Sequence, residues 1–180
     1  YALEKLRLNR QTRIKPGVDD KILASWNGLL ITGLCDAYRA TGDESIRLLA
    51  SQTGFFIRDH MIVSGKLFHN YKNGKATITA FLEDYAAVIE GYLALYQITF
   101  NESWLKQAQQ LCDYTITNFY DPHDGFFFFT DFEGEVLIAR KKEIFDNVIP
   151  SSNSIMASNL YQIGKILDRE DYLHISNEML

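Results

Sequence analysis

The sequence predicts an all-α fold with small β-hairpins, in which helix pairs repeat to form an α/α solenoid or a closed toroid. Three observations predict it. The turn at residues 41–46 reappears at residues 99–104, an offset of 58 (99 − 41), and a looser copy follows at residues 167–172, an offset of 68 (167 − 99). Helices that are apolar nearly all round alternate with amphipathic ones. Segments of alternating polarity between the pairs predict β-hairpins.

The expected elements follow in order along one domain of residues 1–180. Helices are expected at residues 2–12, 22–40, 45–61, 80–98, 103–120, 151–167 and 172–180. Hairpins are expected at about residues 65–79 and 125–140. The helix-pair repeats therefore cover about residues 20–64, 80–122 and 151–180.

The first pair has recognisable boundaries. The break at residues 13–17 contains Pro and Gly and ends the amphipathic N-terminal helix. Asp19 and Asp20 stand where an N-terminal cap would begin the next helix. Gly42 suits the C-terminal cap of that helix, which is apolar on nearly every side and so predicted to be buried.

Hairpin signals separate the later pairs. Asn73–Gly74 between alternating runs is the strongest short-range hairpin signal in the chain. A second hairpin is predicted with residues 126–130 against residues 136–139, turning at Glu133–Gly134. After each hairpin an apolar helix begins again, so both hairpins fall on one rim of the repeat.

Composition excludes two classes of partner. The 180 residues carry a net charge of −5 and no long basic run that would bind nucleic acid. No apolar stretch approaches the roughly 20 residues of a membrane-spanning helix. Cys35 and Cys112 lie within helical patterns, so we expect reduced, buried thiols in a cytoplasmic protein. Because the chain starts at Tyr1 and stops within a helical pattern, we expect a piece of a longer protein.

Polar triplets occupy matching positions at the starts of the three apolar helices. They are Ser25–Trp26–Asn27, Glu83–Asp84–Tyr85 and Ser151–Ser152–Asn153. A repeat places equivalent residues at one level of an architecture. We therefore predict that the three triplets open into one common hollow on the hairpin-bearing rim.

Four acids of this rim are candidate catalytic residues: Asp20, Glu83, Asp84 and Asp146. Two neighbouring carboxyl groups can divide into a proton donor and an ionised partner, as glycoside hydrolysis requires. The alternative is structural, since an acid at a helix start accepts backbone N–H groups and complements the helix dipole. Glu83 and Asp84 lie slightly inside their helix among apolar residues, where a buried acid needs a partner.

Six residues are candidates for holding a ligand: Trp26, Asn27, Tyr85, Arg140, Lys142 and Asn153. Trp26 and Tyr85 could stack on a sugar ring, or could equally belong to the core. Arg140 and Lys142 could hold a carboxylate or phosphate, although solvated salt bridges are the simpler interpretation. Asn153 opens a helix, where it could serve as a cap or help to bind an anion.

Histidine spacing predicts no metal site. His60, His69, His123 and His174 show none of the usual metal-ligand motifs, and nothing resembles a nucleotide-binding loop, so neither a metal nor a cofactor is predicted. His69 lies on the first hairpin and could act as a base. A packed or surface histidine is the simpler alternative.

Three segments resemble a known family. Residues 19–29 (DDKILASWNGL) are similar to its D-D-K-x-L-x-S-W-N-G-L motif, residues 80–86 (AFLEDYA) to its A-F-L-E-D-Y-A segment, and residues 150–154 to its P-S-G-N-S segment, with Ser152 in place of glycine. The family is the thioredoxin-domain-containing proteins related to the spermatogenesis-associated proteins of animals. The resemblance implies an N-terminal thioredoxin-like domain followed by a six-hairpin α/α toroid of the glycosidase and sugar-epimerase type. This chain would be about half of that toroid.

Two hypotheses follow. The first is a carbohydrate-active or carbohydrate-binding domain, glycoside hydrolase-like or sugar epimerase-like, in which an epimerase would need histidine bases and only His69 is suitably placed. The second is a non-catalytic scaffold serving the linked thioredoxin-like domain. The isolated piece is expected to show weak or no catalysis and to self-associate through uncovered inner helices.

Overall fold

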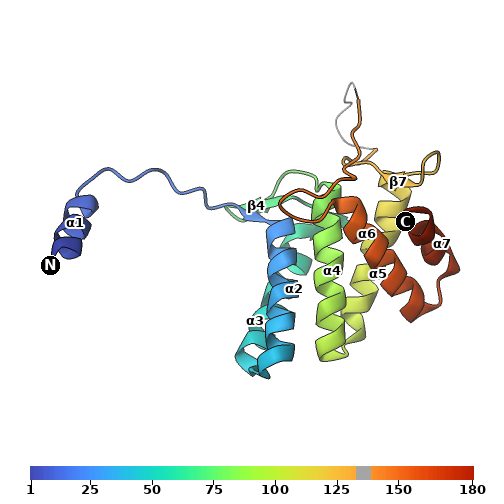
Figure 1. Ribbon diagram of the computed structural model, residues 1–180, viewed down its shortest axis with the longest axis horizontal. Helices are drawn as coiled ribbons and strands as arrows, with labels where there is room; N and C mark the ends of the chain where they lie inside the picture. Colours follow the sequence, from blue (N-terminus) through green and yellow to red (C-terminus); the bar gives the residue numbers. More distant parts are fainter. Residues whose placement is uncertain (133–138) are drawn as a thin grey trace.

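The computed structural model describes residues 1–132 and 139–180, which contain seven α-helices. They are α1 (Ala2–Gln11), α2 (Ala24–Thr41), α3 (Glu44–Phe56), α4 (Leu82–Thr99), α5 (Glu102–Phe119), α6 (Ser152–Leu167) and α7 (Glu170–Glu178). In Figure 1, α2, α4 and α6 lie side by side, each followed by its antiparallel partner α3, α5 or α7. A short π-helical turn, Ile57–Met61, extends α3. The predicted helical architecture with small hairpins is confirmed.

The turn repeat is reproduced in the backbone. The residue after each inner helix is left-handed, with φ of 69°, 52° and 53° at Gly42, Phe100 and Asp168. The next residue caps the outer helix in the first two pairs: Asp43 accepts a hydrogen bond from the Ser45 N–H, and Asn101 from the Ser103 N–H. The starts of α2 and α4 are 58 residues apart (82 − 24), as predicted. The start of α6 falls 70 residues after that of α4 (152 − 82), two more than the turns indicate.

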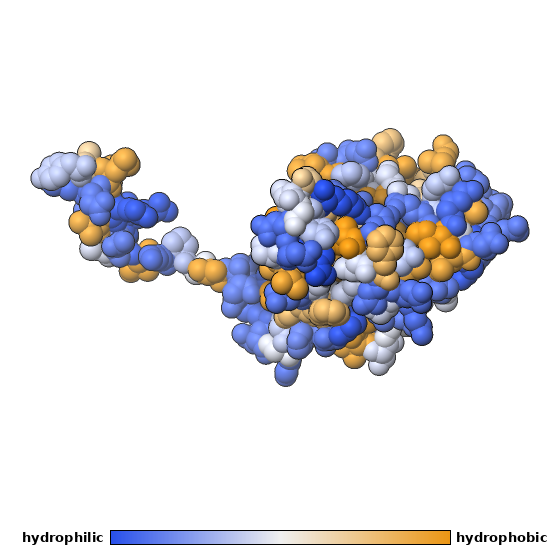
Figure 2. Space-filling view, turned by 90° about the horizontal axis from the view of Figure 1, so that it is seen from below, coloured by the Kyte–Doolittle hydropathy of each residue, from blue (hydrophilic) through white to orange (hydrophobic). Residues whose placement is uncertain are grey.

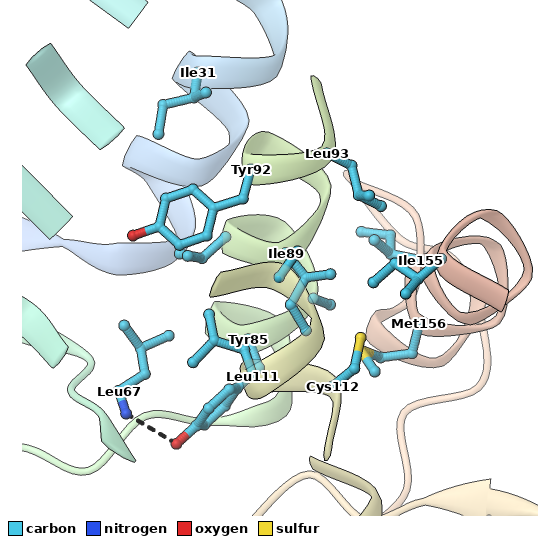
Figure 3. Close-up of a cluster of buried hydrophobic side chains, with 14 of the residues drawn as sticks. Ile31, Leu67, Tyr85, Ile89, Tyr92, Leu93, Leu111, Cys112, Ile155 and Met156 are labelled. Atoms are coloured by element: carbon cyan, nitrogen blue, oxygen red, sulfur yellow. Dashed lines mark hydrogen bonds between the residues drawn. The ribbon is translucent and has the colours of Figure 1, made fainter. Parts of the chain in front are cut away.

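Helix α4 is the centre of the core. Its side chains pack towards α2 on one side and towards Ile155 and Met156 of α6 on the other (Figure 3). Two glycines let α2 and α4 approach closely. A Cβ on Gly28 would lie 2.5 Å from the carbonyl carbon of Ala87, and one on Gly91 would lie 3.0 Å from the Gly28 carbonyl oxygen. This backbone-to-backbone contact fixes the beginnings of the two helices relative to each other.

The described residues form seven short strands, which lie along the rim. They are β1 (Ile22–Leu23), β2 (Ile62–Val63), β3 (Lys66–Leu67), β4 (Asn70–Lys72), β5 (Lys75–Ala76), β6 (Tyr120–Asp121) and β7 (Phe126–Phe127). The predicted hairpin at Asn73–Gly74 is confirmed as β4–β5, with both turn residues at positive φ. β1 extends it to three antiparallel strands. β2 and β3 form a further hairpin that the sequence did not predict.

The second predicted hairpin is described only in part. Phe126–Phe127 pair with Tyr120–Asp121 at the end of α5, a pairing that the sequence did not predict. The expected turn at Glu133–Gly134 and most of the returning strand lie outside the described residues. A run of four phenylalanines has no polar alternation, so its sequence pattern does not specify which neighbour it pairs with.

The N-terminal segment stands away from the helical body. Helix α1 forms as predicted but buries none of its residues, and an extended stretch separates it from α2 (Figures 1 and 2). Asp19 and Asp20 lie exposed in that stretch. The predicted cap at these acids is wrong, because β1 intervenes and Leu23 is the N-cap residue of α2.

Two expectations from composition concern membrane spanning and the two cysteines. Within the described ranges, none of the helices combines the length and the apolar character that crossing a bilayer requires. Cys35 and Cys112 are both buried free thiols, as predicted. Burial raises the pKa of Cys35 to about 11, which keeps this thiol in its unreactive protonated form.

Candidate functional site

The predicted rim lies at one end of the helical body. Helices α2, α4 and α6 all begin there, beside the hairpins (Figure 1). A direct bond joins the first two starts, since the Ser25 N–H donates to the Asp84 carboxylate at 3.0 Å. Phe81 stacks on Phe129, whose N–H in turn bonds the Lys141 carbonyl in the segment before α6. The rim is therefore continuous from α2 to that segment.

Asp84 is the junction of this rim. Its side chain is fully buried and accepts three hydrogen bonds: from the N–H groups of Ser25 (3.0 Å) and Phe81 (2.9 Å), and from Nδ1 of His69 (2.8 Å). Ser25 is in the first turn of α2 and Phe81 is the N-cap residue of α4. One carboxylate thus caps two helices, whose positive dipole ends converge on it. The structural alternative is confirmed for Asp84, although the carboxylate also holds a histidine.

His69 is fixed between α2 and the hairpin. Its carbonyl accepts a hydrogen bond from the Ala24 N–H at 2.8 Å, its N–H donates to the Ile78 carbonyl at 2.7 Å, and its ring packs edge-on against Phe81. Because an ionised carboxylate only accepts, Nδ1 carries the proton shared with Asp84, and Nε2 is the nitrogen available for other partners. The hydrogen bond to Asp84 raises the pKa of His69, while burial opposes the shift.

Glu83 lies beside this pair in a half-buried position. One of its carboxylate oxygens, an Asp84 oxygen and a ring nitrogen of His69 all lie within 4.8 Å of one another. Burial raises the pKa of Glu83, as do the charges of Asp84 and Glu143, while His69 and Lys141 lower it. No hydrogen bond or ion pair reaches this carboxylate from residues 1–132 or 139–180. A carboxyl group with a raised pKa suits a proton donor.

A groove of about 790 Å³ opens beside His69, between α2, α3 and the first hairpin. Trp26, Asn27, Phe56 and His69 are part of its wall. Trp26 is 72% exposed, so the face of its indole ring is available to a ligand. The Asn27 side chain donates to the Leu23 carbonyl, which holds the start of α2 beside the groove. The structure thus brings Trp26 and Asn27 together with the histidine that Asp84 holds.

His69, Glu83 and Asp84 offer donor atoms that could coordinate a metal ion. The hydrogen bonds argue against this use, because both Asp84 oxygens are already engaged: Oδ1 by Ser25, and Oδ2 by Phe81 and His69. A cation would have to displace the proton between His69 and Asp84. The geometry favours hydrogen bonding and proton transfer over metal binding.

Two residues predicted to hold a ligand are tied to the core. Tyr85 is fully buried, and its hydroxyl accepts a hydrogen bond from the Leu67 N–H at 3.0 Å (Figure 3). Asn153 is 2% exposed and bonds both the N–H and the carbonyl of Phe127. The rim position expected for Tyr85 is wrong, because successive helix residues point about 100° apart and the residue after Asp84 already faces the core.

The two predicted cations have partners on their own loop. The Arg140 guanidinium lies 4.0 Å from the ring centroid of Phe128 and donates to the Thr130 carbonyl. Lys142 is paired with Asp121 at 2.6 Å. These contacts correspond to the simpler interpretation, in which both cations hold the loop together.

The remaining two acids also have structural partners. Asp146 accepts a hydrogen bond at 2.7 Å from the N–H of Ser151, the N-cap residue of α6. Asp20 is exposed and forms an ion pair with Lys72 at 2.5 Å. Neither side chain contacts the His69–Asp84 pair.

The third helix start faces a different hollow. A pocket of about 460 Å³ has Asn153, Ser154 and Tyr161 in its wall, together with residues of α7. It shares no residue with the groove beside His69. Glu83, Asp84 and Tyr85 are in the wall of neither hollow. The common hollow predicted for the three triplets is therefore wrong: Trp26 and Asn27 line the groove, Asn153 lines the second pocket, and the second triplet joins the first through the bond between Asp84 and Ser25.

Comparisons with known proteins agree with the resemblance in the sequence. No protein-family model matches the chain. Spermatogenesis-associated protein 20 of Rattus norvegicus is 35% identical to it over 183 residues, and that of Homo sapiens is 34% identical. Each match covers 96% of this chain and 23% of the relative. The chain thus spans about a quarter of the length of the curated relatives that it matches.

Solved carbohydrate-processing enzymes share the fold. A GH76 α-mannanase of Bacteroides thetaiotaomicron superposes with a TM-score of 0.73 at 20% identity, covering 99% of this chain and 52% of that one. An unsaturated glucuronyl hydrolase of Bacillus sp. GL1 gives 0.70 at 18%, covering 92% and 48%. Cellobiose 2-epimerase of Bacillus thermoamylovorans gives 0.72 at 15%, covering 90% and 44%. At such identities the likeness shows the fold alone. Motifs, relatives and architecture together show that the chain is similar to a part of spermatogenesis-associated protein 20 and is folded as part of an α/α toroid of the six-hairpin, glycosidase-like type.

Proposed function

We propose that the groove beside His69 is part of a carbohydrate site, and that the chain is a carbohydrate-active or carbohydrate-binding region. One observation carries the proposal. The exposed indole of Trp26 shares the groove with His69, and the Asp84–Glu83 acid pair stands directly behind that histidine. Sugar sites combine a flat aromatic surface, which stacks on the apolar face of a ring, with polar groups that bond its hydroxyls.

Asp84 and Glu83 would have different roles because their surroundings differ. Asp84 is held as an ionised structural acceptor, whereas the half-buried Glu83 has a raised pKa and a carboxylate without a bonded partner among the described residues. This difference supports Glu83 as the proton donor of the site. The mannanase, glucuronyl hydrolase and epimerase of the same fold act on sugars, which supports the substrate class proposed here.

Tryptophan fluorescence tests the binding function. The chain has two tryptophans, and Trp104 is only 1% exposed in the core, so a ligand-dependent change reports on Trp26. Cellobiose and D-mannose are suitable probes, since structures of the same fold include a cellobiose epimerase and a D-mannose isomerase. Because Trp26→Ala lacks this reporter, its binding is measured by isothermal titration calorimetry, and it should be at least tenfold weaker than that of the wild type.

Leu30→Ala provides the matched control for this experiment. Leu30 is an exposed apolar residue one turn further along α2 that takes no part in the groove. Its replacement should leave sugar binding unchanged. Equal weakening by both variants, or no response to any sugar at millimolar concentration, would contradict the proposal.

A scaffold function is the second candidate, and helix capping favours it. Asp84 and Asp146 both bond backbone N–H groups at helix starts, as acids of purely structural use do. On this alternative the rim would present the linked thioredoxin-like domain with its partner, and no sugar would bind. Interaction of a separately expressed thioredoxin-like domain with this chain, in the absence of sugar binding, would decide for the scaffold.

We also propose the setting in which the chain works. Two buried free thiols suit a reducing, cytoplasmic compartment. The matched relatives are about four times longer than this chain, a length sufficient for the rest of the toroid and a thioredoxin-like domain. The exposed Leu30 of α2 is apolar, lies outside the groove and would be covered by a neighbouring helix or by self-association. Light scattering over a concentration series tests the self-association.

A further inference from the structure

We propose that His69 is the proton-transferring residue of the groove, with Asp84 as its positioning residue. The proposal deepens the carbohydrate function above and rests on it. Of the two interpretations that the sequence left open for His69, it favours the base over a packed or surface histidine. It also assigns the reaction to acid–base chemistry at a hydroxyl group.

The position of His69 is defined on three sides. Backbone hydrogen bonds tie it to Ala24 at the start of α2 and to Ile78 in the hairpin, and its ring is held by Asp84 at 2.8 Å. The Asp84 carboxylate is itself fixed by two backbone donors. A histidine held this way by a buried acid keeps one tautomer and one orientation, as general acid–base catalysis requires.

Glu83 lies close to His69 on the side of α4. A ring nitrogen of the histidine and a carboxylate oxygen of Glu83 lie within 4.8 Å of each other. Glu83 is not in the wall of the groove, whereas His69 is. A sugar hydroxyl that enters from the groove therefore meets His69, and Glu83 acts on the histidine through its charge.

The proton transfer that this arrangement supports is balanced without a further reactant. The hydroxyl O–H bond breaks, its electron pair stays on the oxygen, and the proton passes to Nε2 of His69. Asp84 remains ionised and stabilises the imidazolium that forms.

The charges around His69 come from three neighbours. Asp84 and Glu83 on α4 favour the imidazolium, and Lys21 before β1 opposes it. The pKa of His69 is accordingly raised by these acids, with the hydrogen bond that His69 donates to Asp84 as the largest cause. Removal of the Asp84 charge should therefore lower it.

NMR of the 15N-labelled protein tests the proposal. Long-range 1H–15N spectra show which ring nitrogen carries the proton, and His69→Gln assigns the signals among the four histidines. The neutral ring of His69 should carry its proton on Nδ1, with a pKa above that of free histidine. Asp84→Asn should lower this pKa, whereas Asp20→Asn, which removes an acid that contacts Lys72 instead, should not. Cellobiose should shift the Nε2 signal of the wild type.

The outcomes separate the two proposals. A neutral His69 that carries its proton on Nε2 would overturn the role of Asp84. This measurement is made on the wild-type protein, so it remains decisive if Asp84→Asn does not fold. Cellobiose that quenches Trp26 but leaves the Nε2 signal unmoved would overturn the role of His69 while the binding function stands. Cellobiose that affects neither residue would overturn the carbohydrate function itself.

Discussion

Replacement of Asp84 by alanine should destabilise the protein more than the loss of any other rim acid. The substitution removes three hydrogen bonds, two of them to backbone N–H groups of Ser25 and Phe81 that have no route to water beside a fully buried side chain. Each buried donor left without a partner costs about 1–3 kcal/mol. Loss of the charge at two helix N-termini adds about 0.3–1 kcal/mol for each helix. Together these give a loss of about 3–8 kcal/mol.

Urea unfolding followed by far-ultraviolet circular dichroism measures this loss. The expected cost is a large part of the roughly 5–15 kcal/mol by which domains are stable, so the unfolding midpoint should fall steeply. Asp20→Ala is the control, because that acid is exposed and forms only a surface ion pair, and it should leave the midpoint unchanged. If the two variants unfolded at similar urea concentrations, Asp84 would not be the junction of α2 and α4.

Three further predictions concern packing, the core and pH. Gly28→Ala should cost about 1–3 kcal/mol or more, because its Cβ meets the backbone of α4, whereas Gly33→Ala on the same helix meets nothing and should stabilise by about 0.5–1 kcal/mol in urea unfolding. Tyr85→Phe should cost about 1–3 kcal/mol by leaving the Leu67 N–H unpaired, yet should not change sugar binding measured by fluorescence. The raised pKa of His69 contributes stability below the unfolded value of about 6.5, and this stability is lost as pH rises through the folded value. As the pH rises through this value, the urea concentration at the unfolding midpoint should therefore fall less for His69→Gln than for the wild type.

Local signals account for what the sequence predicted correctly. The left-handed residue at Gly42 depends on chemistry within a few residues, and it ends the helix where the sequence predicted. The hairpin at Asn73–Gly74 follows from the positive φ that these residues tolerate. Trp26 and Asn27 reach the groove because they share the first turn of α2.

Long-range contacts account for the rest. The bond between Ser25 and Asp84 joins residues 59 positions apart, and no local pattern indicates it. His69 was considered as a possible base, but its bond to Asp84 was not predicted, because the two residues lie 15 positions apart on different elements. The alternating sequence pattern around His69 and Asn70 was the one signal that this polar side chain faces inward. Tyr85 was misplaced because the repeat identifies a level in the architecture but not a direction around the helix.

A crystal structure of the protein soaked with cellobiose or D-mannose tests most directly whether the joined starts of α2 and α4 form a sugar site. The account predicts a sugar ring stacked on Trp26, with one hydroxyl within hydrogen-bond distance of Nε2 of His69. A sugar bound instead at the pocket beside Tyr161, or an empty groove at concentrations that saturate the fluorescence change, would contradict it.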